Sequence, residues 1–109
     1  MSTPASKSRR EVLEGIVAAQ PGDAFARYGL ALECANSGDT HAALAHFRQL
    51  LAAHPGYVAG HQQYGQLLAR MGLHEDARRA FREGIAAAQQ SGNAHAAAEM
   101  EEALHSLGV

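Results

Sequence analysis

The sequence predicts an all-α fold of about six helices arranged as stacked antiparallel pairs, and three observations lead to this prediction. Residues recur at a spacing of 34, most clearly Gly38 with Gly72 and Phe47 with Phe81. The apolar residues around them follow helical spacing, with neighbours three and four positions apart. No segment has the alternating β-branched pattern of a half-buried strand. A helical repeat of this length cannot bury its apolar face alone, so successive units are expected to stack.

The helix ends follow from local residue chemistry. We expect helices at residues 7–20, 24–37, 40–54, 58–71, 74–90 and 93–107. Asp23 and Asp39 stand at helix starts, where a carboxylate can accept hydrogen bonds from unpaired N–H groups. Gly38 and Gly72 stand where a helix must stop and turn, because glycine adopts positive φ at no steric cost.

The first helix is predicted to be the second half of an incomplete unit. It ends at Pro21, as helix 40–54 ends at Pro55, because proline cannot continue the hydrogen-bond ladder. Its apolar stripe follows helical spacing and consists of Val12, Leu13, Ile16 and Val17.

The last helix breaks the strict period. Counting by 34 would place Glu99 and Glu102 in the core, which is costly for charged groups. We therefore predict a slip of about two residues, because Gln89 replaces the closing proline and lets helix 74–90 run longer. The apolar stripe of the last helix would then be Ala97, Met100, Leu104 and Leu107.

Taken position by position, the repeats resemble the tetratricopeptide repeat family, which has the same period. The first unit matches the family pattern at Leu30, Ala31, Cys34, Gly38, Ala43, Phe47, Leu50, Leu51 and Pro55. The second unit matches it at Tyr64, Gly65, Leu68, Gly72, Ala77, Phe81, Gly84 and Ile85, with Gln89 at the position of the closing proline. Arg27 and His61 depart from the pattern, which has an aromatic residue there.

The resemblance covers residues 24–91 and implies a right-handed superhelix of antiparallel helix pairs, a TPR-like α-solenoid. We expect a single domain over residues 1–109. It would comprise a flanking helix at 7–20, repeats at 24–57 and 58–91, and a capping helix at 93–107.

The resemblance also implies a concave groove, lined by the first helix of each unit, that holds a partner peptide or protein segment. The family's groove positions fall on Phe25, Tyr28, Leu32, Asn36, Gln62, Gln63, Gln66 and Arg70, and with the slip on His95, Glu99 and Glu102. This surface is apolar and aromatic at one end, rich in amides in the middle and acidic at the far end. The alternative is that its polar residues form an ordinary solvated face.

The family's best-known groove chemistry, a cationic clamp on a peptide C-terminal carboxylate, does not fit these residues. Such a clamp needs several cations that converge on one carboxylate. Tyr28 and Leu32 occupy the early clamp positions, and Lys7 is the only lysine. A ligand with an apolar anchor and a basic end fits better.

Composition excludes several other classes. With 109 residues the chain is long enough for one domain, and 9 basic against 11 acidic side chains argue against nucleic-acid binding. Cys34, the only cysteine, is expected to be a buried apolar residue in a reducing compartment. The N-terminal residues lack a signal-peptide pattern and no segment has membrane-spanning length, so we expect a cytoplasmic protein without a membrane partner.

No cofactor, metal or catalytic site is predicted. The seven histidines include no HExxH pair. A basic cluster at Arg78, Arg79 and Arg82 is expected to pair with the acidic residues of the last helix as a solvated surface.

We therefore expect a non-enzymatic protein-interaction scaffold that binds a partner segment in its groove. The alternative is a homo-oligomerising or regulatory adaptor module that uses its terminal helices. In that case the alanine-rich last helix could pack on a copy of itself, giving a homodimer.

Overall fold

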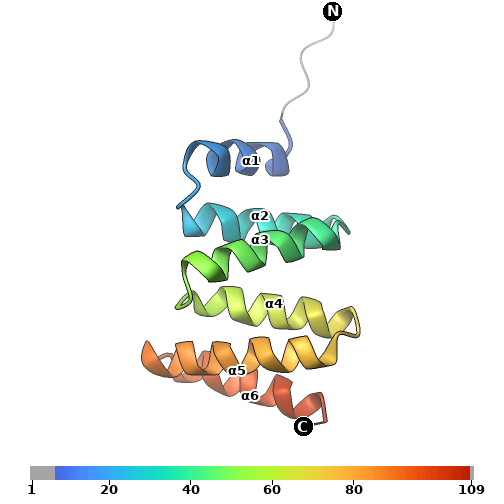
Figure 1. The fold of residues 1–109 in the computed structure, drawn as a ribbon, viewed down its shortest axis with the longest axis vertical. Helices are drawn as coiled ribbons and strands as arrows, with labels where there is room; N and C mark the ends of the chain where they lie inside the picture. The colour runs from blue at the N-terminus through green and yellow to red at the C-terminus, as the bar shows by residue number, and fades with distance from the viewer. Residues whose placement is uncertain (1–6, 109) are drawn as a thin grey trace, which may run out of the picture.

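The computed structural model describes residues 7–108, which form six α-helices stacked along the longest axis of the molecule (Figure 1). The helices are α1 (Arg9–Ala19), α2 (Ala24–Asn36), α3 (Thr40–Ala53), α4 (Val58–Arg70), α5 (His74–Gln90) and α6 (Ala94–Ser106). Each end lies within two residues of the predicted end. The all-α prediction is confirmed, since the helices pack as antiparallel pairs with α1 and α6 at opposite ends of a 59 × 27 × 21 Å stack.

Side-chain caps begin four of the helices. The Asp23 carboxylate accepts from the N–H of Ala26 (3.0 Å) and the Asp39 carboxylate from the N–H of Ala42 (3.2 Å), as predicted. Asn93 begins α6 in the same way, with 3.1 Å to the N–H of Ala96. The fourth cap, a reciprocal capping box between Ser8 and Glu11, begins α1.

Three helices end in the same glycine turn. Gly38, Gly72 and Gly92 have φ values of +86°, +78° and +72°. In each turn the N–H after the glycine donates to a carbonyl five residues back, the pattern that satisfies the last carbonyls of a helix. These bonds are Asp39 N–H to Cys34 O (2.9 Å), Leu73 N–H to Leu68 O (2.9 Å) and Asn93 N–H to Ala88 O (2.8 Å).

The predicted slip before the last helix is confirmed. With no closing proline, α5 runs for 17 residues against 14 in α3. α4 begins at Val58, one full period after the start of α2, whereas α6 begins at Ala94, two positions later than a further period would place it. This shift buries Met100 completely and leaves Glu99 and Glu102 exposed.

The core is built on bulky residues packed against very small ones. Phe47 and Phe81 are 1% and 2% exposed; the Phe47 ring packs against Tyr64 across the junction between units, and the Phe81 ring lies against Gly65 within one unit. A Cβ at Gly65 of α4 would lie 2.6 Å from the Phe81 ring, so only glycine allows this approach of α4 to α5. Likewise, a Cβ at Gly84 would lie 2.5 Å from the sulfur of Met100, at the meeting of α5 and α6.

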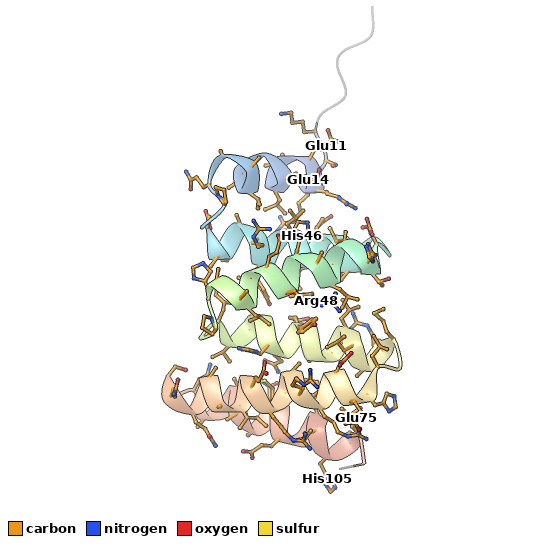
Figure 2. All side chains as sticks on the ribbon, viewed as in Figure 1. Glu11, Glu14, His46, Arg48, Glu75 and His105 are labelled. Carbon is orange, nitrogen blue, oxygen red and sulfur yellow. The ribbon has the colours of Figure 1, made fainter. Side chains whose placement is uncertain are left out.

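The junction between the two repeats lies between α3 and α4. Phe47 of α3 packs against Tyr64 of α4 with ring centroids 5.9 Å apart. Arg48, labelled in Figure 2, donates from Nε to the Tyr64 hydroxyl at 3.1 Å. The Tyr64 ring is thereby held between an apolar contact and a polar one.

The apolar stripe of α1 is only half used. Leu13 and Val17 pack onto the core, and Leu13 faces Gly29 of α2, where a Cβ would lie 3.4 Å from the leucine side chain. Val12 and Ile16 are 47% and 38% exposed, so the four-residue stripe does not face one partner. Leu13 and Val17 are therefore packed on the core, while Val12 and Ile16 remain exposed.

The six helices form two rows. α2 contacts α4, and α4 contacts α6, whereas within residues 7–108 no two of α1, α3 and α5 contact each other. In a curved stack the helices on the inside of the curve approach one another. We therefore call α2, α4 and α6 the inner row and α1, α3 and α5 the outer row. No helix in residues 7–108 is both long and apolar enough to cross a bilayer.

Candidate functional site

All eleven residues predicted to line the groove lie on the inner row. α2 carries Phe25, Tyr28, Leu32 and Asn36; α4 carries Gln62, Gln63, Gln66 and Arg70; α6 carries His95, Glu99 and Glu102. Because these three helices contact one another in order, the eleven residues lie along one row of the stack.

An aromatic cluster of Phe25, Tyr28 and Tyr57 forms the apolar end of this surface. Phe25 is 78% exposed. Tyr28 lies one helical turn further along α2, and its ring is 5.3 Å from that of Tyr57, which immediately precedes α4. The sequence analysis missed Tyr57 because it lies in the turn before α4, outside the helical positions that were compared.

Both tyrosines of the cluster keep their protons at neutral pH. Burial raises the pKa of Tyr28 and of Tyr57 above the ordinary tyrosine value. Their hydroxyls can therefore donate hydrogen bonds to a ligand as well as accept them.

The middle of the surface consists of half-buried glutamines. Gln63 occupies the position that Gly29 holds in the preceding unit, one full period earlier. A Cβ at Gly29 points at Leu13 of the outer row. By the same register Gln63 lies toward α3, at the edge of the surface, whereas Gln62 and Gln66 lie nearer its centre.

The far end is exposed and mixed in charge. Asn36 and Arg70 lie at the ends of α2 and α4, while Glu99 and Glu102 lie on α6. Glu99 pairs with His95 of the preceding turn at 3.3 Å. The two carboxylates leave this end acidic apart from Arg70.

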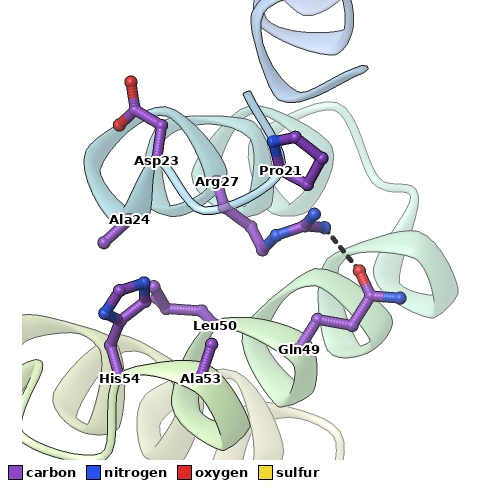
Figure 3. Close-up of a pocket in the computed structure, with 8 residues that line it drawn as sticks. All are labelled: Pro21, Asp23, Ala24, Arg27, Gln49, Leu50, Ala53 and His54. Atoms are coloured by element: carbon purple, nitrogen blue, oxygen red, sulfur yellow. Dashed lines mark hydrogen bonds between the residues drawn. The ribbon is translucent and has the colours of Figure 1, made fainter. Parts of the chain in front are cut away.

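Three hollows lie outside this surface, and none of the eleven predicted groove residues lines them. Two have a volume of about 260 Å³ each and lie between an inner-row helix and the outer-row helix of the same unit. They are the same site repeated one period apart. The first, shown in Figure 3, is lined by Pro21, Arg27, Gln49 and Ala53, and the second is lined by Pro55, His61, Glu83 and Ala87. The third, of about 320 Å³, lies on the outer face of α1.

Arg27 and His61, which replace the family's aromatic residue, line the first two hollows and are held by polar contacts. Arg27 donates to Gln49 and contacts Nδ1 of His46 at 3.3 Å. His61 is 4% exposed, and its Nε2–H donates to the carbonyl of Pro55 at 2.7 Å. Nδ1 of His61 is buried without a hydrogen-bond partner among the described residues.

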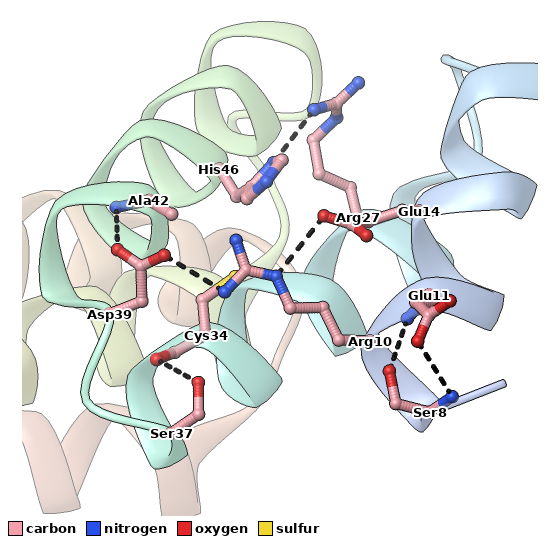
Figure 4. A network of polar contacts seen from close by, with 10 residues as sticks. All are labelled: Ser8, Arg10, Glu11, Glu14, Arg27, Cys34, Ser37, Asp39, Ala42 and His46. Carbon is pink, nitrogen blue, oxygen red and sulfur yellow. Dashed lines mark hydrogen bonds and ion pairs between the residues drawn. The ribbon is translucent and has the colours of Figure 1, made fainter. Parts of the chain in front are cut away.

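A polar network attaches α1 to the first repeat (Figure 4). Arg10 lies 3.0 Å from the Asp39 carboxylate and 3.3 Å from that of Glu14. The hydrogen bond from the N–H of Ala42 lowers the pKa of Asp39, and the hydrogen bond from Arg10 lowers it further. Cys34 lies beneath Arg10, and burial raises the pKa of its thiol, so Cys34 packs as a protonated apolar residue.

Within residues 7–108 no three His, Cys, Asp or Glu side chains converge as metal ligands.

Comparisons with known proteins agree with this architecture. The family model described as tetratricopeptide repeat matches residues 36–101. The solution structure of a tetratricopeptide repeat domain protein from Salinibacter ruber is 31% identical, with a TM-score of 0.76 over 81% of this chain and 89% of that one. The crystal structure of a tetratricopeptide repeat domain protein from the same organism is 30% identical, with a TM-score of 0.75 over 79% and 97% of the two chains.

A protein from Bordetella parapertussis has a similar fold, with 29% identity and a TM-score of 0.80 over 94% of this chain and 90% of that one. Comparison with curated proteins gives no match. The family model covers more than half of the chain, and its match spans α3, α4, α5 and the first part of α6. The chain therefore belongs to the tetratricopeptide repeat family.

Proposed function

We propose that this protein binds a segment of a partner protein along the inner row, with the aromatic cluster of Phe25, Tyr28 and Tyr57 as the anchor site. Tetratricopeptide repeat domains are generally protein-interaction modules, and the proposed role is non-enzymatic. The observation that carries the proposal is the exposure of Phe25, at 78%, beside the packed pair of tyrosine rings. Exposed aromatic residues on a rigid helix are typical anchors of protein interfaces.

The ligand that fits best has an apolar anchor and a basic end. Its apolar side chain would pack on the aromatic cluster, and amides of Gln62 and Gln66 could pair with its backbone. Glu99 and Glu102 would attract lysine or arginine at the other end. A carboxylate-clamp ligand fits poorly, since Tyr28 and Leu32 offer no cation.

The proposal is tested with peptides selected against the protein from a random displayed library. In NMR titrations, the backbone signals of α2, α4 and the turn at Tyr57 are expected to shift first. Phe25→Ala is expected to weaken the affinity about tenfold or more, the range of an interface anchor. Arg79→Ala removes an exposed side chain from the outer row and serves as the control. Shifts confined to α1, α3 and α5, or full affinity in Phe25→Ala, would contradict the proposal.

Self-association is the second candidate function. It is favoured by a separate observation, the uncovered apolar face of α1 at Val12 and Ile16.

A further inference from the structure

The outer face of α1 is uncovered at positions that the repeats bury. α1 has the register of an outer-row helix, one repeat period before α3. Ile16 corresponds to Leu50, yet Ile16 is 38% exposed and Leu50 is 0% exposed. Val12 is 47% exposed next to it. With Gly15 and Ala19 these residues line the hollow of about 320 Å³.

The helix at the other end of the stack, α6, also has an uncovered face. Leu104 is half-buried, whereas the corresponding residue of α4, Leu68, is 0% exposed. Glu101 is exposed and corresponds to Gly65, which is buried against Phe81 of α5. The uncovered side of α6 is therefore the side on which α4 meets its outer-row partner.

The helix at each end of the stack is of the kind that the other end lacks as a partner. α1 is an outer-row helix with no inner-row partner before it among residues 7–108, and α6 is an inner-row helix with no outer-row partner after it (Figure 1). We propose that α6 of one copy packs antiparallel against α1 of a second copy, so that the two helices form a composite helix pair. This contact continues the stack from copy to copy.

Charge and size complement each other in this composite pair. Within one copy, Gly65 of α4 faces Phe81 of α5. In the composite pair, Glu101 takes the place of Gly65 and Leu13 takes the place of Phe81. Glu101 of the first copy would therefore face Leu13 of the second. Leucine is smaller than phenylalanine and leaves room for the Cβ that Gly65 lacks. One turn before Leu13 lies Arg9, whose side chain is 72% exposed and reaches Glu33 at 3.3 Å. It can turn to the Glu101 carboxylate, and Lys7 at the rim of the hollow adds a second cation.

The proposed contact is heterologous, since each copy uses a different surface on each side. Such a contact leaves a free surface at each end and produces open chains of increasing length. The two surfaces lie at opposite ends of the long axis, marked in Figure 2 by Glu11 on α1 and His105 on α6. The inner-row surface stays open in this arrangement, so assembly is independent of the proposed partner binding.

Sedimentation velocity over increasing protein concentration tests the proposal. The wild-type weight-average mass is expected to rise past that of a dimer of the 11.5-kDa chain. Ile16→Glu and Glu101→Arg each block one surface and are each expected to be monomeric. Mixed together they are expected to form 1:1 dimers and nothing larger, because each retains one working surface. The control Met71→Glu places the same charge on an apolar residue of similar exposure, 39%, in the turn between α4 and α5, and should assemble as the wild type does.

Charge reversal gives a second test that does not depend on Ile16. Arg9→Glu alone is expected to weaken assembly, and Arg9→Glu combined with Glu101→Arg to restore it. Circular dichroism verifies that each variant keeps its helical content. A wild type that stays at 11.5 kDa at all concentrations overturns the proposal. So does dimerisation of either single-surface variant on its own, which would show contact between two like ends.

Discussion

At the scale of single residues, the contact between Arg27 and His46 shows how a polar pair is accommodated between α2 and α3. Arg27 donates to Nδ1 of His46 at 3.3 Å, so this nitrogen must be unprotonated and the proton of the neutral ring lies on Nε2. Burial, then the positive charges of Arg27 and Arg10, lower the pKa of His46; Glu14 and Asp39 oppose them only in part. The folded protein thus favours neutral His46.

This preference predicts a pH dependence of stability. Because the pKa of His46 is lower in the folded state, the unfolded chain binds a proton more readily. The contribution of neutral His46 to the free energy of unfolding is complete above the ordinary histidine pKa of about 6.5. It is lost as the pH falls from there through the lower pKa that His46 has in the folded protein. His46→Gln keeps a hydrogen-bond acceptor for Arg27 but does not titrate, so its free energy of unfolding should fall less on acidification.

Urea denaturation at a series of pH values measures the effect. The control His41→Gln removes an exposed histidine from the same helix and retains His46, so its slope should match that of the wild type. Equal slopes for His46→Gln and the wild type between pH values near neutrality and about 5 would contradict the assignment.

At the scale of helices, the spacing within each pair depends on where glycine stands. Gly65 lets α4 approach α5, since a Cβ there would lie 2.6 Å from the Phe81 ring. Gly65→Ala is expected to destabilise the fold by about 1–3 kcal/mol, the range of overpacking in a dense core. Gly29 is the matched control, because it also lies within an inner-row helix but its Cβ would stay 3.4 Å from Leu13.

Gly29→Ala is expected to stabilise the protein by about 0.5–1 kcal/mol, because alanine is the better helix former. Thermal and urea unfolding of the two variants therefore should give changes of opposite sign. Destabilisation of similar size in both would mean that α1 packs on α2 as tightly as α5 packs on α4.

The positions of the helices could be predicted because their signals are local or periodic. Caps at Asp23 and Asp39, glycine turns at Gly38 and Gly72 and the missing proline at Gln89 each act within a few residues of their own position. The repeat period then placed these signals in register and assigned the predicted groove residues to α2, α4 and α6.

The remaining features depend on contacts across helices that no local signal specifies. Tyr57 joins the aromatic cluster only because its turn brings it to Tyr28 of another helix. Val12 and Ile16 share helical spacing with Leu13 and Val17, so the sequence alone could not separate the covered half of the stripe from the uncovered half. The hollows beside Arg27 and His61 likewise depend on how side chains pack between helices.

At the scale of the whole molecule, the stack is a chain of neighbouring contacts. Each helix contacts the helices next to it in sequence, and the only contacts beyond these are α2 with α4 and α4 with α6 within residues 7–108. In such a linear array, stability is the sum of the units and their interfaces, so cooperation between the repeats depends on the junction between them. Phe47, buried at the α3–α4 junction against Tyr64, is the largest apolar residue there.

Phe47→Ala is therefore expected to lower the free energy of unfolding by about 3–5 kcal/mol and to uncouple the two halves. Hydrogen exchange should then show α1–α3 opening at lower denaturant than α4–α6, as separate units. Phe81→Ala removes the same ring from within the α4–α5 pair and is the control, with a similar loss of stability but no early opening of α1–α3. If Phe47→Ala still unfolds in one step, with all six helices opening together, the α3–α4 junction does not couple the repeats. The contacts among the inner-row helices α2, α4 and α6 would then carry the coupling.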